Sequence, residues 1–113
     1  MNVTVNTVEQ ITVVNLEGDL DGKTAPEVQA QLTPLIQGGG KMILDMAKVP
    51  YMSSAGLRVL LMLYRQASTN NGKIVLVGLS EELADTMSVT GFLNFFTTSE
   101  TLDSGVKILN KNE

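Results

Sequence analysis

Two short runs of consecutive apolar residues, on either side of a long apolar segment, restrict the fold more than any other feature of this sequence. The runs at residues 42–44 (MIL) and 74–77 (IVLV) lack polar alternation, which is typical of strands buried on both faces of a sheet. Between them, nearly every residue from Leu57 to Tyr64 is apolar, as in a buried helix, and residues 70–72 (NNG) end that segment. Strands that alternate with helices in this way predict an α/β domain.

The N-terminal part of the sequence adds a hairpin to this pattern. β-Branched residues are concentrated in Val3 to Thr7 and in Ile11 to Glu17, on either side of a short polar link, which predicts two paired strands. The whole is therefore expected to be a mixed central β-sheet of four to five strands with helices packed on it. The 113 residues contain no linker, repeat or low-complexity segment, so we expect one domain over residues 1–113.

Local signals indicate where the other elements begin and end. The segment from Thr24 to Glu27 has the spacing of a capping box, and Ser80 precedes an acidic turn that suits a helix N-terminus. Pro34 lies within the first helix, so we expect a kink or a break near Thr33. A last short strand and a terminal helix are predicted from Phe95-Phe96 and from the helical spacing of Leu102, Val106 and Leu109.

The composition excludes several classes of function. The chain has no Cys and no His, which removes disulfides, thiolate nucleophiles, sulfur metal sites and the commonest general base, and we expect no metal and no cofactor. A net charge of -4, with eight Lys and Arg spread along the sequence, argues against binding to nucleic acid or to an anionic membrane. The N-terminal segment has no export signal and no membrane span is present, so we expect a cytoplasmic protein.

Three possible site motifs are set aside on their spacing. The glycines before Lys41 would need a Ser or Thr after the lysine to form a phosphate loop. The DLDG segment from Asp19 to Gly22 lacks the later ligands of a calcium loop. Ser54 with Lys48 would make a small hydrolase only if a loop folded back, and no hydrolase motif has this spacing.

Two adjacent serines, Ser53 and Ser54, stand directly before the apolar helix. One serine at this position is what an N-cap requires, but one cap does not account for two serines. The small residues Ala55 and Gly56 follow them and leave a hydroxyl open to approach by another protein. From these residues alone, a helix cap and a functional hydroxyl are both open readings.

Several segments, taken in order, resemble the STAS-domain anti-sigma factor antagonists of bacteria. The most specific is the Ser-Ala-Gly-Leu core within residues 51–57 (YMSSAGL), and the Gly-Asp-Leu-Asp turn supports it. The resemblance runs from Val3 to about Ile108 and also includes residues 24–27 (TAPE), 43–45 (ILD) and 89–92 (VTGF).

This resemblance implies a binding protein that is not an enzyme. In that family the unphosphorylated antagonist binds an anti-sigma factor serine kinase and releases the sigma factor. Phosphorylation by that kinase, which binds the ATP, switches binding off, and a serine phosphatase reverses the modification. The family's phosphoserine falls on Ser54, with Ser53 as a second acceptor. The docking rim implied around it consists of Asp19, Asp21, Lys23, Tyr51, Met52, Ser53, Ala55, Gly56 and Arg58.

A departure from the family pattern supports an alternative. Many members have Asp before the phosphoserine and Ser or Thr after it, where this chain has Ser53 and Ala55. The alternative is a phosphorylation-independent STAS scaffold, or a regulatory module in another bacterial signalling system.

Overall fold

The structure, a computed structural model, describes residues 1–111 and begins with a tight hairpin. Strand β1 (Asn2–Val8) pairs antiparallel with β2 (Ile11–Glu17). The two residues between them, Glu9 and Gln10, have positive φ angles of 47° and 68°, as a type I′ turn requires at both central positions. The predicted hairpin is confirmed.

The rest of the sheet is parallel and is formed as the buried runs predicted. Strands β3 (Lys41–Lys48), β4 (Lys73–Val77) and β5 (Thr97–Ser99) extend it in the order β1-β2-β3-β4-β5. The helices between and after the strands are α1 (Ala25–Ile36), α2 (Ser54–Thr69), α3 (Glu81–Val89) and α4 (Leu102–Asn110). The mixed α/β sheet is confirmed, with five strands in the described part of the chain.

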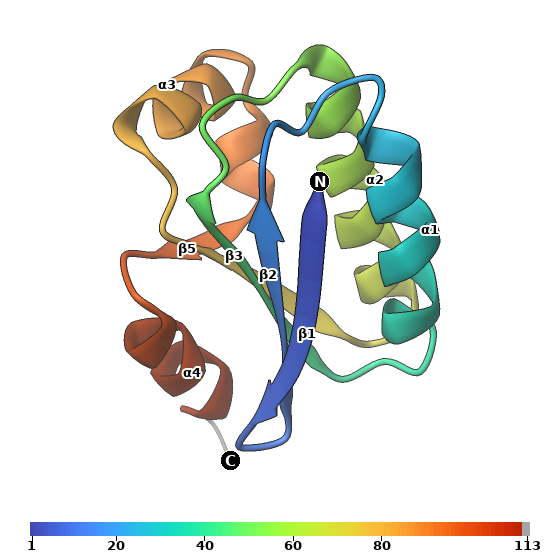
Figure 1. Cartoon of the computed structure of the whole chain (residues 1–113). Helices are drawn as coiled ribbons and strands as arrows, with labels where there is room; N and C mark the ends of the chain where they lie inside the picture. The colour runs from blue at the N-terminus through green and yellow to red at the C-terminus, as the bar shows by residue number, and fades with distance from the viewer. Residues whose placement is uncertain (112–113) are drawn as a thin grey trace.

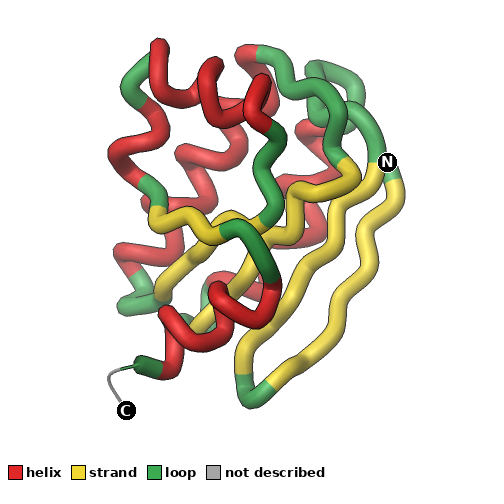
Figure 2. Tube along the Cα trace, turned by 90° about the vertical axis from the view of Figure 1, so that its left-hand side faces the viewer, coloured by secondary structure: helices red, strands yellow, loops and turns green. Residues whose placement is uncertain are grey.

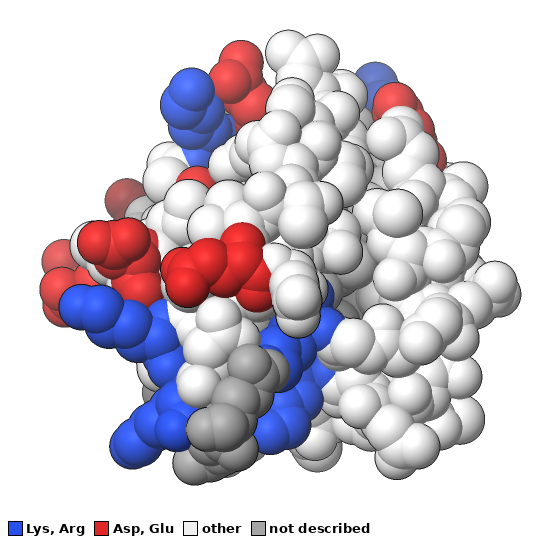
Figure 3. Space-filling model, turned by 90° about the horizontal axis from the view of Figure 1, so that it is seen from below, with Lys and Arg blue, Asp and Glu red and all other residues white. Residues whose placement is uncertain are grey.

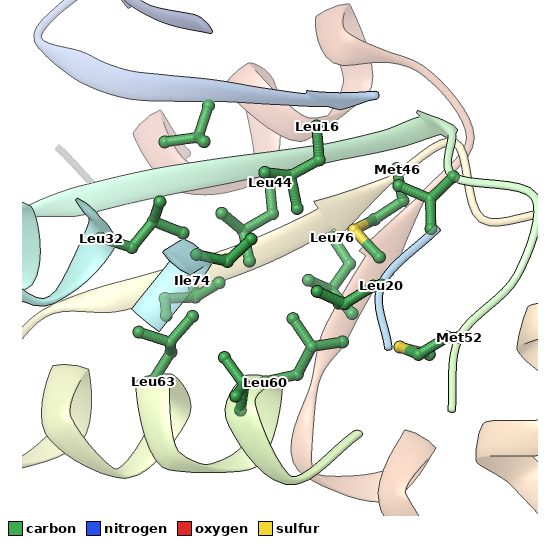
Figure 4. Packing of buried hydrophobic residues seen from close by; sticks show 14 of the residues in the cluster. Leu16, Leu20, Leu32, Leu44, Met46, Met52, Leu60, Leu63, Ile74 and Leu76 are labelled. Atoms are coloured by element: carbon green, nitrogen blue, oxygen red, sulfur yellow. The ribbon is translucent and has the colours of Figure 1, made fainter. Parts of the chain in front are cut away.

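Two hydrophobic cores lie on opposite faces of the sheet. Because side chains alternate along a strand, Leu44 faces the helices α1 and α2 while its neighbour Ile43 faces α4. Figure 1 shows α1 and α2 on one side of the sheet and α4 on the other. In the larger core, Leu60 and Leu63 of α2 point toward the strand residues (Figure 4). The runs lack polar alternation because both faces of these strands are covered.

Two local features differ from the expectation. The break near Thr33 is absent, because Pro34 lies inside α1 without ending it and the helix continues to Ile36, while the alternative of a kink stays a prediction. The proline is exposed and close to the helix C-terminus, so the carbonyl group that loses its amide partner can bond to water. Phe95 lies in a short 3₁₀ helix, Phe92–Phe95, and not in a strand. Its ring and that of Phe96 pack on Tyr64, with centroids 6.0 and 5.5 Å away, and the last strand begins only after them.

Candidate functional site

The loops after β2 and β3 meet at one edge of the sheet and are joined by backbone hydrogen bonds. Leu20 and Met52 form an isolated parallel bridge. The Leu20 amide donates to the Tyr51 carbonyl oxygen at 2.9 Å, and the Leu20 carbonyl oxygen accepts from the Ser53 amide at 2.9 Å. This is the edge at the carboxyl ends of the parallel strands, where α/β sheets bind ligands and partners (Figure 1). The two loops are therefore held as one surface.

The two serines have different positions and partners. Ser53 is the N-cap of α2, with extended backbone angles, and its Oγ accepts a hydrogen bond from the Gly56 amide at 3.4 Å. Ser54 is the first residue of the helix and is exposed. Its hydroxyl forms no hydrogen bond with any residue from 1 to 111. The helix is thus capped without Ser54, whose hydroxyl remains available.

Gly56 permits the close approach of α2 to the loop after β2. A Cβ atom at this position would lie 2.5 Å from the Leu20 carbonyl oxygen and 2.8 Å from Cγ of Met52. No side chain larger than hydrogen fits without movement of the backbone. The small residue serves packing inside the site, and it does not itself leave the hydroxyl open.

Two residues assigned to the docking rim are buried, and that assignment is corrected. Met52 is 5% exposed and belongs to the larger core, where its side chain lies near Leu20 (Figure 4). Gly56 is buried beneath the same loop. By contrast, Tyr51 is 54% exposed although it is the adjacent residue. Met52 and Gly56 therefore support the site from within.

The loop before α1 is closed by a reciprocal capping box that starts earlier than predicted. Oδ1 of Asp21 accepts from the Thr24 amide at 3.2 Å, and Oγ1 of Thr24 accepts from the Asp21 amide at 3.0 Å. The box expected to begin at Thr24 does not form, because that hydroxyl is already engaged with Asp21 and also donates to the Asp19 carbonyl oxygen at 2.8 Å. The backbone N–H of Lys23, and after it that of Thr24, lower the pKa of the Asp21 carboxyl by bonding to its charged form.

The remaining residues of the predicted rim lie at the surface. Asp19, Lys23 and Arg58 are exposed, and Ala55 is half-buried. Between the N-terminal halves of α1 and α2 there is an open hollow of about 260 Å³, and Ala55 and Arg58 are among its lining residues. Tyr51 and Ser54 are also exposed, so these residues are the accessible part of the predicted rim.

A Ser-Lys catalytic pair is not formed. Nζ of Lys48 lies 3.6 Å from Oε2 of Glu17 in an exposed ion pair, and the Ser54 hydroxyl has no hydrogen bond to any described residue. Within the described part of the chain, no three Asp or Glu residues come close enough together to hold a metal ion.

Lysines that are distant in the sequence come together at the opposite edge of the sheet. Lys41 and Lys73 are register partners at the starts of β3 and β4, and Nζ of Lys41 donates to Oδ1 of Asn110 at the end of α4. The view from below shows positive side chains gathered on this side next to carboxylates (Figure 3). The sequence suggested a uniform spread of positive charge, whereas the fold groups part of it away from Ser54.

Comparison with known proteins identifies the family. The family model of the STAS domain matches residues 2–105. The anti-sigma-B factor antagonist of Bacillus subtilis is 30% identical over 107 residues, which are 95% of this chain and 98% of that protein. This chain belongs to the STAS-domain family of anti-sigma factor antagonists.

Solved structures of STAS-domain proteins share the fold. An anti-sigma factor antagonist from Mycobacterium paratuberculosis superposes with a TM-score of 0.85 at 21% identity, over 96% of this chain and 92% of that one. The anti-sigma factor antagonist SpoIIAA of Bacillus matches in its unphosphorylated form with a TM-score of 0.74, at 17% identity over 99% and 100% of the two chains. Its phosphorylated form matches with a TM-score of 0.73, at 18% identity over 96% and 100%. None of the helices in residues 1–111 of this STAS domain has both the length and the apolarity for a membrane crossing.

The structure also gives a role to Leu20, which the sequence analysis did not single out. It is fully buried in the loop after β2, and its backbone forms hydrogen bonds with Tyr51 and Ser53, the residues on either side of Met52. Its carbonyl oxygen and Cγ lie so close to Gly56 that no larger residue fits there without movement. The available signal was a single apolar residue between two aspartates. A side chain of this kind in a polar turn usually anchors the turn to the core.

Proposed function

We propose that this STAS domain is an anti-sigma factor antagonist controlled by phosphorylation of Ser54. The unphosphorylated chain binds an anti-sigma factor serine kinase and thereby releases the sigma factor, and phosphorylation on Ser54 prevents that binding. The observation that carries the proposal is the exposed Ser54 hydroxyl, which takes no part in the capping that Ser53 performs.

A phosphate fits the start of α2 electrostatically. Phosphorylation adds about -1.5 to -2 charges, and the N-terminus of a 16-residue helix presents free amide groups and the positive end of the dipole. Arg58 follows Ser54 by one helical turn and is exposed, so it can approach a phosphate on the same face. The modification therefore stabilises the helix start, and the fold does not need to change.

The effect of phosphate is then exerted on the partner. Added charge and bulk at the centre of a docking surface cause repulsion and steric clash in a complex that fits the bare serine. The proposed docking surface comprises Asp19, Asp21, Lys23, Tyr51, Ser53, Ala55 and Arg58 around Ser54.

In this scheme the domain is a substrate and a ligand. The kinase supplies the ATP site and the catalytic groups, and a serine phosphatase restores the binding form. Ser53 is the second possible acceptor, but its Oγ already bonds to the Gly56 amide, so we place the phosphate on Ser54.

The experiment is phosphorylation of the purified chain by the anti-sigma kinase encoded in its genomic neighbourhood, with the phosphate located by mass spectrometry. We expect phosphate on Ser54 in the wild type, none in Ser54→Ala, and retained modification in the control Ser53→Ala. Ser54→Ala should bind the kinase and Ser54→Asp should bind it more weakly in calorimetric titrations. Binding of the kinase without any phosphate on either serine would favour the phosphorylation-independent scaffold, which the Ser53 departure supports.

A further inference from the structure

Strand β1 is an uncovered edge of the sheet. Of the described strands it pairs with β2 alone, and no bulge interrupts their register. Figures 1 and 2 show no helix or loop along its outer side. Its sequence, NVTVNTV, has neither charged residues nor proline, which are devices that usually protect an exposed edge from pairing with another chain.

The backbone of β1 offers outward hydrogen-bonding groups at every second residue. In an antiparallel pair, opposite residues alternate between exchanging hydrogen bonds and not exchanging them. Counting from Val8 and Ile11, which flank the two-residue turn as a hydrogen-bonded pair, Val3, Val5 and Thr7 direct their N–H and C=O groups away from β2. These are the groups with which an added strand would pair.

The sequence of this edge is complementary to itself. Residues 2–6 read Asn-Val-Thr-Val-Asn, which is identical in both directions. If two copies pair antiparallel about Thr4, Val3 lies opposite Val5, Thr4 opposite Thr4, and Asn2 opposite Asn6. The valine pairs fall where both backbones direct their groups outward, so this register also satisfies the hydrogen-bond alternation.

The side chains suit the same pairing on both faces. Val3 packs against the larger core and Val5 is 46% exposed, so an apolar strip extends from that core to the edge. In the paired arrangement the valines of both copies would be adjacent on this face. Thr4 and the asparagines would be adjacent on the other face, where Thr–Thr pairs and hydrogen-bonded polar pairs stabilise neighbouring strands.

We propose that β1 is a dimerisation edge, at which a second copy of this chain pairs antiparallel about Thr4 and joins the two five-stranded sheets. The partner is a second copy because a two-fold interface needs a surface complementary to itself, and the palindromic segment provides one. The two-fold axis at Thr4 points the Ser54 edges of the two copies in opposite directions. Each copy keeps its serine surface free.

Single-cysteine cross-linking tests the register, because the chain has no cysteine of its own. In Thr4→Cys the two sulfurs meet across a pair without hydrogen bonds, and oxidation by copper-phenanthroline and oxygen should give a covalent dimer on a non-reducing gel. Asn6→Cys is the matched control, exposed on the same face of β1 but roughly 13 Å from its equivalent in the other copy. Equal cross-linking of the two variants would overturn the proposed register.

Sedimentation equilibrium tests the association itself. The wild type should approach twice its monomer mass as concentration rises, and Val5→Lys should raise the dissociation constant at least tenfold. Val89→Lys is the control, since Val89 is 87% exposed on α3, and it should leave the constant unchanged. The dimer would be refuted if the wild type stayed monomeric at millimolar concentration, or if Val5→Lys and Val89→Lys raised the dissociation constant equally. The edge would then be free or would pair with a different protein.

Discussion

The close approach of Gly56 to the Leu20 carbonyl group allows a direct test of how the start of α2 packs against the loop after β2. In an exposed helix interior, replacing glycine by alanine stabilises a protein by about 1 kcal/mol. In Gly56→Ala the new Cβ would instead lie 2.5 Å from a backbone oxygen and within 3 Å of two carbon atoms, Cγ of Met52 and Cγ of Leu20. Real Cβ atoms do not come this close, so either α2 or the Leu20 loop must move.

The magnitude follows from the atoms that would have to move. Overpacking a well-filled site costs typically about 1–3 kcal/mol. The oxygen met here is backbone, held by the 2.9 Å hydrogen bond from Ser53, so it cannot turn away as a flexible side chain could. We expect Gly56→Ala to lower the free energy of unfolding by about 1–3 kcal/mol, despite the better helix propensity of alanine. At about 4 °C per kcal/mol for a domain of this size, the melting temperature should fall by roughly 4–12 °C.

The assay is urea unfolding followed by circular dichroism, with Gly22→Ala as the matched control. Gly22 lies in the loop before α1, and a Cβ placed there meets no atom within 4 Å. Its replacement should be neutral or slightly stabilising, because alanine reduces the freedom of the unfolded chain. If Gly56→Ala proved as stable as Gly22→Ala, the close approach of α2 to the Leu20 loop would not be a feature of the folded protein.

Three further predictions concern single residues of the same edge. Ser53→Ala removes the N-cap of α2 and should lower the free energy of unfolding by about 1 kcal/mol, whereas Ser54→Ala should leave it nearly unchanged. Thermal unfolding of the two variants would measure this difference, and equal losses would contradict it. Met52→Ala should cost about 2–5 kcal/mol, and the exposed Tyr51→Ala should cost far less, as chemical denaturation of the pair would show. The pKa of the Asp21 carboxyl is lowered, so this group contributes stability above its unfolded pKa of about 3.9, and the contribution is lost as the pH falls through the lower folded value. An NMR titration of the carboxyl carbon checks this, and a midpoint at or above about 3.9 would exclude the contribution.

Sequence patterns within single segments predicted the architecture, because the arrangement of apolar residues in a helix or strand depends on which of its faces are buried. The uninterrupted apolar runs predicted that β3 and β4 are covered on both faces, and the few polar residues of α2 predicted a helix with one solvent-exposed face. Ser80 was recognised as a cap, and one of the two serines before α2 was expected to be one, because an N-cap depends only on the next few residues. Ser80 and Ser53 both accept amide hydrogen bonds of this kind. Local physics was sufficient for these features.

The details that the sequence did not predict depend on contacts between distant residues or on competition within one loop. The burial of Met52 and Gly56 results from Leu20, more than thirty residues away, so no local pattern contains it. The capping box at Thr24 failed because Asp21 offered the same hydroxyl a competing partner. Phe96 was predicted to lie in a strand, but it precedes the strand, and its ring packs against the ring of Tyr64 on α2.

The separation of capping and exposure between Ser53 and Ser54 has an evolutionary consequence. Since the cap of α2 is formed by the first serine, the second can change without much loss of stability. Under the proposed function, a single substitution at Ser54 would remove the phosphate acceptor or replace it by a permanent charge. Such a variant would be always active or always silent while the protein still accumulated normally, so that regulation and abundance would be open to selection at two neighbouring codons independently.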